Sequence, residues 1–104
     1  MNRFTDISGF NWDEGNIDKN LIKHNVNNSE IEQIFFNKPL IIHDDKNHSQ
    51  ENEKRFFALG QTNHGRSLFS SFCIRNNLIR IISARDMNKK ESAIYEKAKK
   101  NTRF

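Results

Sequence analysis

The sequence has few of the residues that would support a disulfide framework or a flexible linker. Its 104 residues include one cysteine, Cys73, so neither an internal disulfide nor a cysteine-based zinc cluster is available. The neighbours of this thiol, Phe72 and Ile74, indicate a core position rather than a reactive one. One proline, Pro39, and four glycines leave no linker, and the length predicts a single domain over residues 1–104.

Long hydrophobic runs are also missing. No apolar stretch approaches the roughly 20 residues that cross a bilayer. The polar start MNRFTDISGFNWDEG lacks the basic segment and apolar core of a secretory signal. We therefore expect a cytoplasmic protein without a membrane partner.

Motifs for metals, cofactors and familiar nucleophiles are absent from the sequence. The four histidines lie on different predicted elements, without the paired spacing of metal ligands. They are His24, His43, His48 and His64. The glycines form no phosphate-binding loop, and no Gly-x-Ser-x-Gly elbow is present. The sequence thus predicts neither a metal nor a cofactor.

Positive charge is concentrated at one end of the chain. The formal net charge is +4, but residues 80–104 carry +5 and the other 79 residues carry −1. A basic end on a nearly neutral body suits an anionic partner, either a nucleic acid or an acidic protein surface. A solvated, lysine-rich helix face explains the same charge equally well.

Periodicity in the first part of the chain predicts two helices. Apolar residues at spacings of four and three indicate a helix over about 14–24, and Asn25 suits the left-handed residue that often ends a helix. Asn27 and Glu30 have the spacing of a capping box, which starts a second, short helix that ends near Asn37.

After Pro39 the pattern becomes extended, and four strands are predicted. They span residues 40–43, 54–62, 67–75 and 78–84. Asn76-Asn77 is typical of a two-residue hairpin turn, so the last three strands form an antiparallel meander. A final helix from Asn88 to Lys100 follows. The expected fold is α+β: two N-terminal helices, a four-stranded, largely antiparallel sheet and a C-terminal helix, with the helices on one sheet face.

Four arginines lie on or beside the predicted strands: Arg55, Arg75, Arg80 and Arg85. A charge among apolar neighbours is costly unless it faces solvent or a partner. Cross-strand ion pairs with Glu53 or Asp86 are one explanation. A cationic sheet face that binds phosphates is the other. Strict alternation along the last strand predicts that Arg80 and Arg85 point to opposite faces.

Several short motifs are similar to those of one known family. They are Phe10-x-Trp12-Asp13, Lys19-Asn20-x-x-Lys23-His24-x-Val26, Glu30, Phe35, Glu53-x-Arg55, Ala58-Leu59-Gly60, Arg80-Ile81-Ile82-Ser83-Ala84-Arg85, Glu91 and Tyr95. In this order they resemble the BrnT family of type II toxins, small ribonucleases with a RelE-like fold. The resemblance covers roughly residues 10–96.

The resemblance implies an activity and a partner. The activity is cleavage of RNA, which arrests translation. The partner is an antitoxin of the BrnA type, which binds the toxin and carries a DNA-binding domain, so that DNA is contacted only indirectly. We expect a complex of two toxins with a dimeric antitoxin.

A RelE-like mechanism, in which the RNA 2′-hydroxyl attacks its own 3′-phosphate, assigns roles to particular residues. Arg80 and Arg85 are expected to stabilise the phosphate, and Arg75 to position it. His24 or Glu53 would transfer protons. The remaining candidates for substrate binding are Lys23, Arg55 and Lys89.

A protein of a different class would use the same residues. A non-catalytic binding module could hold an acidic protein partner on a cationic sheet face. The arginines serve both hypotheses, so the sequence does not separate them.

Overall fold

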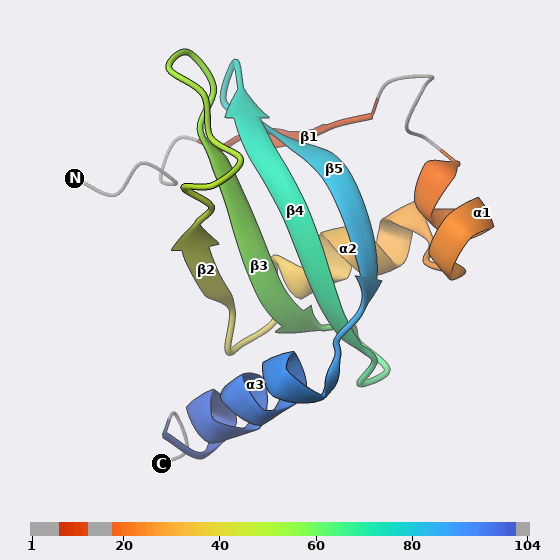
Figure 1. Ribbon diagram of the computed structural model, residues 1–104. Coiled ribbons are helices and arrows are strands. Elements are labelled where there is room, and N and C mark those ends of the chain that lie inside the picture. The colour runs from red at the N-terminus through yellow and green to blue at the C-terminus, as the bar shows by residue number, and fades with distance from the viewer. Residues whose placement is uncertain (1–6, 13–17, 102–104) are drawn as a thin grey trace.

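The structure, a computed structural model, describes residues 7–12 and 18–101 (Figure 1). The elements follow in the order β1 (Gly9–Asn11), α1 (Lys19–His24), α2 (Asn28–Ile34), β2 (Ile41–Asp44), β3 (Arg55–Gln61), β4 (Ser67–Arg75), β5 (Leu78–Asp86) and α3 (Lys89–Asn101). The predicted α+β class is confirmed. The predicted first helix began at about residue 14, and its early part lies outside the described residues.

The strands form one mixed sheet in the order β1-β5-β4-β3-β2. The antiparallel pairs β3–β4 and β4–β5 confirm the predicted meander. Positive φ angles of 52° at Asn76 and 64° at Asn77 confirm the hairpin turn between β4 and β5. The sheet has five strands rather than four, because β1 pairs in parallel with the start of β5.

Local capping signals in the helical part of the sequence are also confirmed. Asn25 ends α1 in the left-handed conformation, with φ of 55°. Asn27 and Glu30 form the predicted capping box of α2. This helix ends at Ile34, three residues before the predicted end.

The main hydrophobic core lies between α2 and one face of the sheet. Ile31 and Ile34 of α2 are fully buried in the same cluster as Phe56 and Phe72. The helix backbone comes very close to Gly60 of β3, where an added Cβ would lie 2.8 Å from the Cβ of Ile34. Glycine is therefore the residue that lets α2 pack on the sheet at this point.

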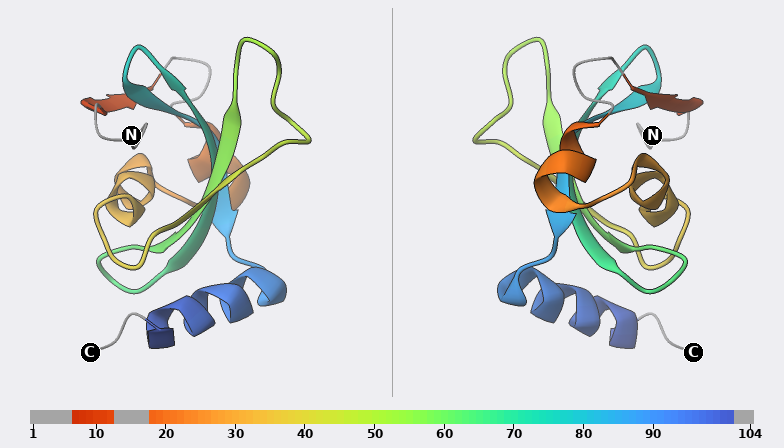
Figure 2. Two further views of the ribbon diagram at one scale, coloured as in Figure 1. Left: turned by 90° about the vertical axis from the view of Figure 1, so that its left-hand side faces the viewer. Right: turned by 90° about the vertical axis from the view of Figure 1, so that its right-hand side faces the viewer.

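The third helix does not join α2 on that face. It crosses the end of the sheet at which β3 and β5 finish, and its first turns border the opposite face (Figure 2). Tyr95 anchors it, because its side chain is fully buried and its hydroxyl donates to the carbonyl of Pro39 at 2.7 Å. The prediction that all helices cover one sheet face is therefore wrong.

A β-bulge interrupts the pairing of β4 with β5. Ser71 pairs with Ser83, whereas the next residue, Phe72, pairs with Ile81. Ile82 is therefore an extra residue on β5, which shifts the alternation of side chains by one position. The burial pattern agrees, since Ile82 and Ser83 are both only partly buried.

The bulge brings Arg80 and Arg85 to the same face of the sheet. Arg80 pairs with Cys73 and Arg85 pairs with Phe69, two residues of β4 that share a face because they are four positions apart. The prediction from strict alternation, which placed the two arginines on opposite faces, is wrong. We call their common face the open face, and the face covered by α2 the core face.

The strand β5 pairs with β1 only at its start. Beyond that point, side chains of α1 form hydrogen bonds with the backbone groups along the edge of β5. The Lys19 ammonium donates to the carbonyl of Ile82 at 2.8 Å, directly at the bulge. The backbone N–H of Ala84 donates to the Oδ1 of Asn20 at 2.9 Å. The Asn20 side chain is only 1% exposed, so its amide replaces a missing strand partner inside the protein.

We expect Asn20→Ala to destabilise the protein by about 1–3 kcal/mol, because the buried N–H of Ala84 would lose its acceptor. The melting temperature should fall by roughly 4–8 °C for each kcal/mol. Thermal unfolding measures the effect, with Asn47→Ala in the exposed loop before β3 as a matched control. An Asn20→Ala protein that melts like the parent would show that the hydrogen bond contributes nothing.

Candidate active site

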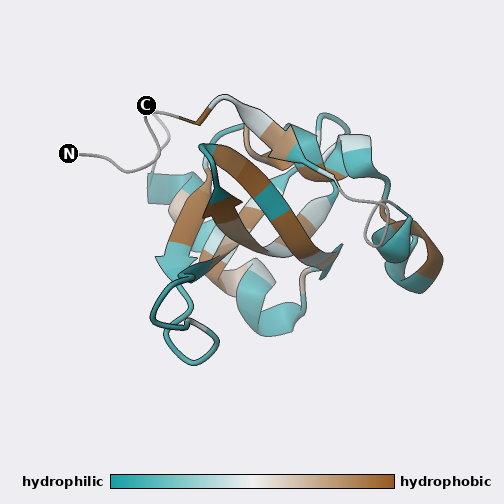
Figure 3. Cartoon of the chain, turned by 90° about the horizontal axis from the view of Figure 1, so that it is seen from above, coloured by the Kyte–Doolittle hydropathy of each residue, from teal (hydrophilic) through white to brown (hydrophobic). Residues whose placement is uncertain are grey.

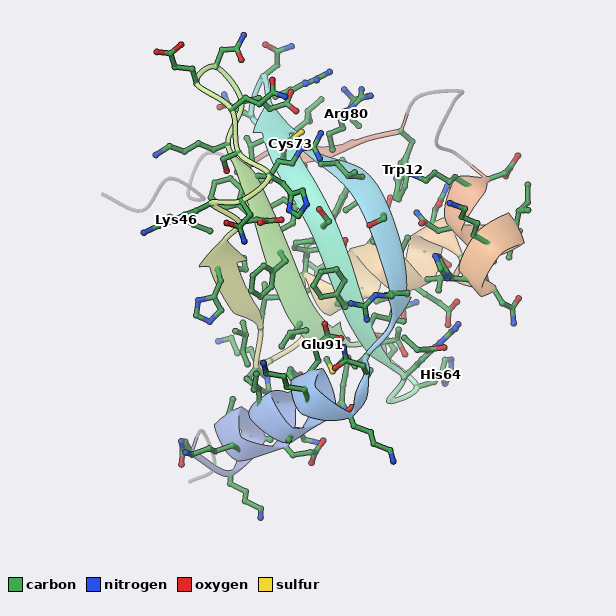
Figure 4. All side chains as sticks on the ribbon, in the orientation of Figure 1. Trp12, Lys46, His64, Cys73, Arg80 and Glu91 are labelled. Atoms are coloured by element: carbon green, nitrogen blue, oxygen red, sulfur yellow. The ribbon has the colours of Figure 1, made fainter. Side chains whose placement is uncertain are left out.

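Three residues of the open face form a row across neighbouring strands. Cys73 of β4 pairs directly with Arg55 of β3 and with Arg80 of β5. Directly paired residues project to the same side of a sheet, so the two guanidinium groups flank the thiol. Figure 4 shows Cys73 and Arg80 at the end of the sheet that carries the β4–β5 hairpin. We call Arg55, Cys73 and Arg80 the arginine row.

A carboxylate and a third arginine complete this cluster. Arg75, at the end of β4, donates from its Nε to Glu53 at 3.0 Å, and Glu53 lies 3.9 Å from the Nε of Arg55. The hydrogen bond from Arg75, assisted by the charges of Arg55 and Arg80, holds the pKa of Glu53 below its usual value. Glu53 is therefore ionised at neutral pH, and three cations surround it.

Cys73 lies at the centre of the row, but its thiol is unreactive. Its side chain is buried, and burial raises the pKa of the thiol. A thiol that stays protonated is a poor nucleophile. The sequence-based assignment of Cys73 as a core residue is confirmed.

At the opposite end of the open face, Arg85 is held by a glutamate of α3. Its Nη1 and Nη2 donate to the two carboxylate oxygens of Glu91 at 2.8 and 2.9 Å. The guanidinium carbon of Arg85 also lies 4.2 Å from the ring centre of Phe69. The hydrogen bonds from Arg85 lower the pKa of Glu91, so this pair stays ionised at neutral pH.

The ion-pair explanation for the strand arginines thus holds in part. Arg75 pairs with Glu53, as that explanation predicts. Asp86, however, binds Arg66 and not a strand arginine, with 2.7 Å between the Nε of Arg66 and a carboxylate oxygen. Arg66 also donates to Glu30 of α2 and to the carbonyl of Asn25, so it links both helices to β5.

Four of the predicted site residues lie away from the arginine row, and Arg85, at the opposite end of the open face, is one of them. His24 and Lys23 are the last residues of α1, and the carbonyl of His24 accepts a hydrogen bond from Arg66 at the far end of β4. Nine residues of β4 separate that end from Arg75, a length of about 30 Å. Lys89 begins α3, beyond the same far end. The structure therefore groups Glu53, Arg55, Arg75 and Arg80. It does not bring the other four predicted site residues to this cluster, namely His24, Lys23, Lys89 and Arg85.

Sequence reasoning missed a set of aromatic side chains on the open face. Phe57 of β3 stacks on Phe69 of β4 with ring centres 5.7 Å apart, and His43 of β2 lies 5.5 Å from Phe57. The signal was present in the alternation of β3, because Phe57 shares its parity with Arg55, whereas Phe56 belongs to the core face. Because the sequence has nine phenylalanines, each of them was interpreted as a core residue.

A comparison with known protein families identifies the chain. A family model described as "Ribonuclease toxin, BrnT, of type II toxin-antitoxin system" matches residues 12–91, which include the whole arginine row. The chain belongs to the BrnT family. Its resemblance to that family, stated above from short motifs, is thereby confirmed. No curated protein matches the chain at a significant level.

Family membership gives the protein's general role. BrnT proteins are ribonuclease toxins of type II toxin–antitoxin systems, so an RNA substrate and an antitoxin partner follow for this BrnT chain. None of its described helices is long and apolar enough to span a membrane. Among the described residues, no group of three or more histidine, cysteine or acidic side chains is placed to hold a metal ion.

Proposed function

We propose that this BrnT protein cleaves single RNA strands at the arginine row without a metal ion. The observation that carries the proposal is the register of β3, β4 and β5, which sets Arg55 and Arg80 on either side of Cys73. Guanidinium groups on rigid strands can bind phosphate oxygens bidentately, and they keep their charge at any physiological pH. They supply the positive charge that metal ions supply in many other nucleases.

The proposed reaction is attack by the RNA itself. The 2′-oxygen forms a bond to the adjacent phosphorus while the bond from phosphorus to the 5′-oxygen of the next nucleotide breaks. The 2′-hydroxyl proton goes to a base, and the departing 5′-oxygen takes a proton from water. The products are a 2′,3′-cyclic phosphate and a 5′-hydroxyl. Negative charge builds up on the phosphate oxygens in the transition state, where fixed cations act most strongly.

We assign Arg80 and Arg55 to the scissile phosphate, and Arg75 to holding Glu53. Glu53, whose pKa is lowered, is ionised at neutral pH, so it would act as the acceptor of the 2′-hydroxyl proton and not as a proton donor. Its position beside Arg55 favours it over His24, which lies at the other end of β4. Arg85, which Glu91 holds, would contact a neighbouring part of the RNA.

We further propose that cleavage inhibits translation and that an antitoxin of the BrnA type silences it. An antitoxin dimer that binds two toxins would give a 2:2 complex, with DNA contacted only by the antitoxin. The arginine row and the basic α3 would both be covered in that complex. The charge on these surfaces is what an acidic segment of an antitoxin would complement.

Cleavage by the purified toxin is expected to continue in excess EDTA, because arginines carry the charge stabilisation. Mass spectrometry of the products should find 2′,3′-cyclic phosphate or 3′-phosphate ends together with 5′-hydroxyl ends. A zinc- or magnesium-dependent nuclease, assayed in the same buffer, confirms that the chelator is effective. Products with 5′-phosphates, or activity that EDTA removes, would contradict the mechanism.

A further inference from the structure

The open face carries a continuous line of aromatic side chains beside the arginine row. His43, Phe57 and Phe69 come from β2, β3 and β4, and the guanidinium group of Arg85 on β5 covers the ring of Phe69. We call His43, Phe57 and Phe69 the aromatic row. It thus crosses three neighbouring strands and ends on a cation.

These rings differ in exposure from the phenylalanines on the core face. Phe56 and Phe72, which stack on each other beneath α2, are 3% and 0% exposed. Phe57 and Phe69 are only partly buried, and His43 is exposed. Partly exposed rings that stack on each other on an uncovered face are not needed to fill the core.

Phe57, the middle member of the aromatic row, lies two residues along the sheet from the arginine row, and Phe69 lies four residues along it. Arg55 and Phe57 are two residues apart on β3, and Cys73 is two residues from Ser71, the partner of Phe57. Two residues of a strand span about 7 Å. One nucleotide of an extended single strand covers a similar distance, so a phosphate on Arg55 and Arg80 would place a neighbouring base over the rings.

A groove beside the rings offers space for that base. It has a volume of about 340 Å³ and lies between the sheet and the start of α3. Phe57, Phe69 and Arg85 line it from the sheet, and Asn88, Lys90 and Ile94 line it from the other side. The two carboxylates that reach the groove are engaged, Glu91 by Arg85 and Asp45 by His48. The groove therefore combines flat apolar surface with cationic edges.

We propose that the aromatic row, together with the Arg85 guanidinium that lies over Phe69, stacks the RNA bases next to the cleaved phosphate, so that the open face binds single-stranded RNA. The proposal rests on the proposed function for the identity of the phosphate site, and it adds the subsite that holds the bases. Aromatic rings interleaved with cations on an exposed sheet are a general means of holding unpaired bases. A paired base offers no free face to the rings, so duplex RNA would not engage them.

The test compares Phe57→Leu and Phe69→Leu with Phe36→Leu. Leucine keeps an apolar side chain but cannot stack, and Phe36, 78% exposed and on the far side of the core, is the matched control. Binding of a fluorescent 2′-O-methyl RNA oligonucleotide, which cannot be cleaved, should weaken by roughly 5- to 100-fold for each stacking variant and remain unchanged for the control.

A conservative variant of Phe69 distinguishes base stacking by the ring from a purely structural role in packing. Phe69→Trp should restore tight binding, and its added fluorescence should be quenched by the oligonucleotide, with the signal of Trp12 in the parent as the baseline. In the cleavage assay the leucine variants should raise KM much more than they lower kcat. Thermal unfolding of each variant gives the fraction of folded protein, by which the binding and cleavage data are corrected.

The outcomes also distinguish this subsite from the proposed function. If Arg80→Ala cleaves like the parent while the leucine variants bind RNA poorly, the phosphate site is wrong and the stacking row is supported. If Arg80→Ala is inactive and both leucine variants bind RNA like the parent, the stacking row is wrong. Leucine variants that lose only affinity for the antitoxin would make the row a protein-docking surface and overturn the proposal.

Discussion

Replacing Arg80 with alanine is expected to lower RNA cleavage by on the order of 10²-fold or more while leaving the melting transition nearly unchanged. The reason is that a fixed donor aimed at the charge of the transition state acts mainly on kcat. Arg80 projects from β5 onto the open face, so its loss leaves the core face intact. Single-turnover cleavage and thermal unfolding of the same preparation measure the two effects.

Arg66→Ala provides the matched control, because it removes an arginine with a structural network. Arg66 joins Asp86, Glu30 and the end of α1, at the end of the sheet far from Arg80. Its loss should lower stability and leave the cleavage rate per folded molecule unchanged. If Arg80→Ala unfolds instead, or if its cleavage rate changes by less than about threefold, Arg80 does not belong to the active site.

The same contacts determine the lowest pH at which the Arg66 network still stabilises the fold. The hydrogen bond from Arg66 lowers the pKa of Asp86. A carboxyl group with a lowered pKa in the folded state stabilises the fold at pH values above its unfolded pKa, near 3.9. This contribution is lost as the pH falls through the lower, folded value. The network therefore stays intact throughout the neutral range in which cleavage would be assayed.

Local sequence signals predicted the meander because each depends on residues that are close in the chain. Two asparagines accept the positive φ angles that the hairpin turn needs, and β4 has the predicted limits, 67–75. Asn25 and the capping box of α2 are equally local. In each case the conformational preference of one or two residues decides the structure.

The errors concern features that depend on distant partners. β1 has only three residues, and its pairing with β5 joins positions 9 and 78, so no local pattern reveals it. The bulge at Ile82 was hidden because an isoleucine suits either face of a strand. The structure shows the break, because the buried residues Ile79, Ile81 and Ala84 change their spacing from two to three.

That bulge had the largest consequence for the candidate site. The prediction supplied all four arginines of the strands but assigned Arg80 and Arg85 to different faces. The structure gathers them on one face and adds the aromatic row between them, with Phe69 directly paired with Arg85. Identifying the site therefore required the register of β4 and β5, which follows from long-range pairing rather than from composition.

Association with the antitoxin is expected to slow steeply as the salt concentration rises, by about 10-fold or more between low and physiological salt. The helix α3 carries five lysines and two glutamates, and one of these, Glu91, is already occupied by Arg85. Lys97 and Lys100 are exposed on this helix. Exposed charge of one sign steers an acidic partner toward the surface, and salt screens this attraction.

Binding kinetics of the purified pair across a salt series, with the double variant Lys97→Glu and Lys100→Glu, test the idea. The double variant should associate more slowly than the parent and depend less on salt, whereas dissociation should change little because buried apolar contacts determine it. Lys46→Glu, in the hydrophilic loop between β2 and β3 (Figure 3), changes the charge beside Arg55 of the arginine row rather than on α3, so comparing the two variants separates the two basic surfaces. An association rate that responds neither to salt nor to the double variant would leave α3 as a solvated helix face, and the antitoxin would then have to recognise the toxin through its apolar surfaces.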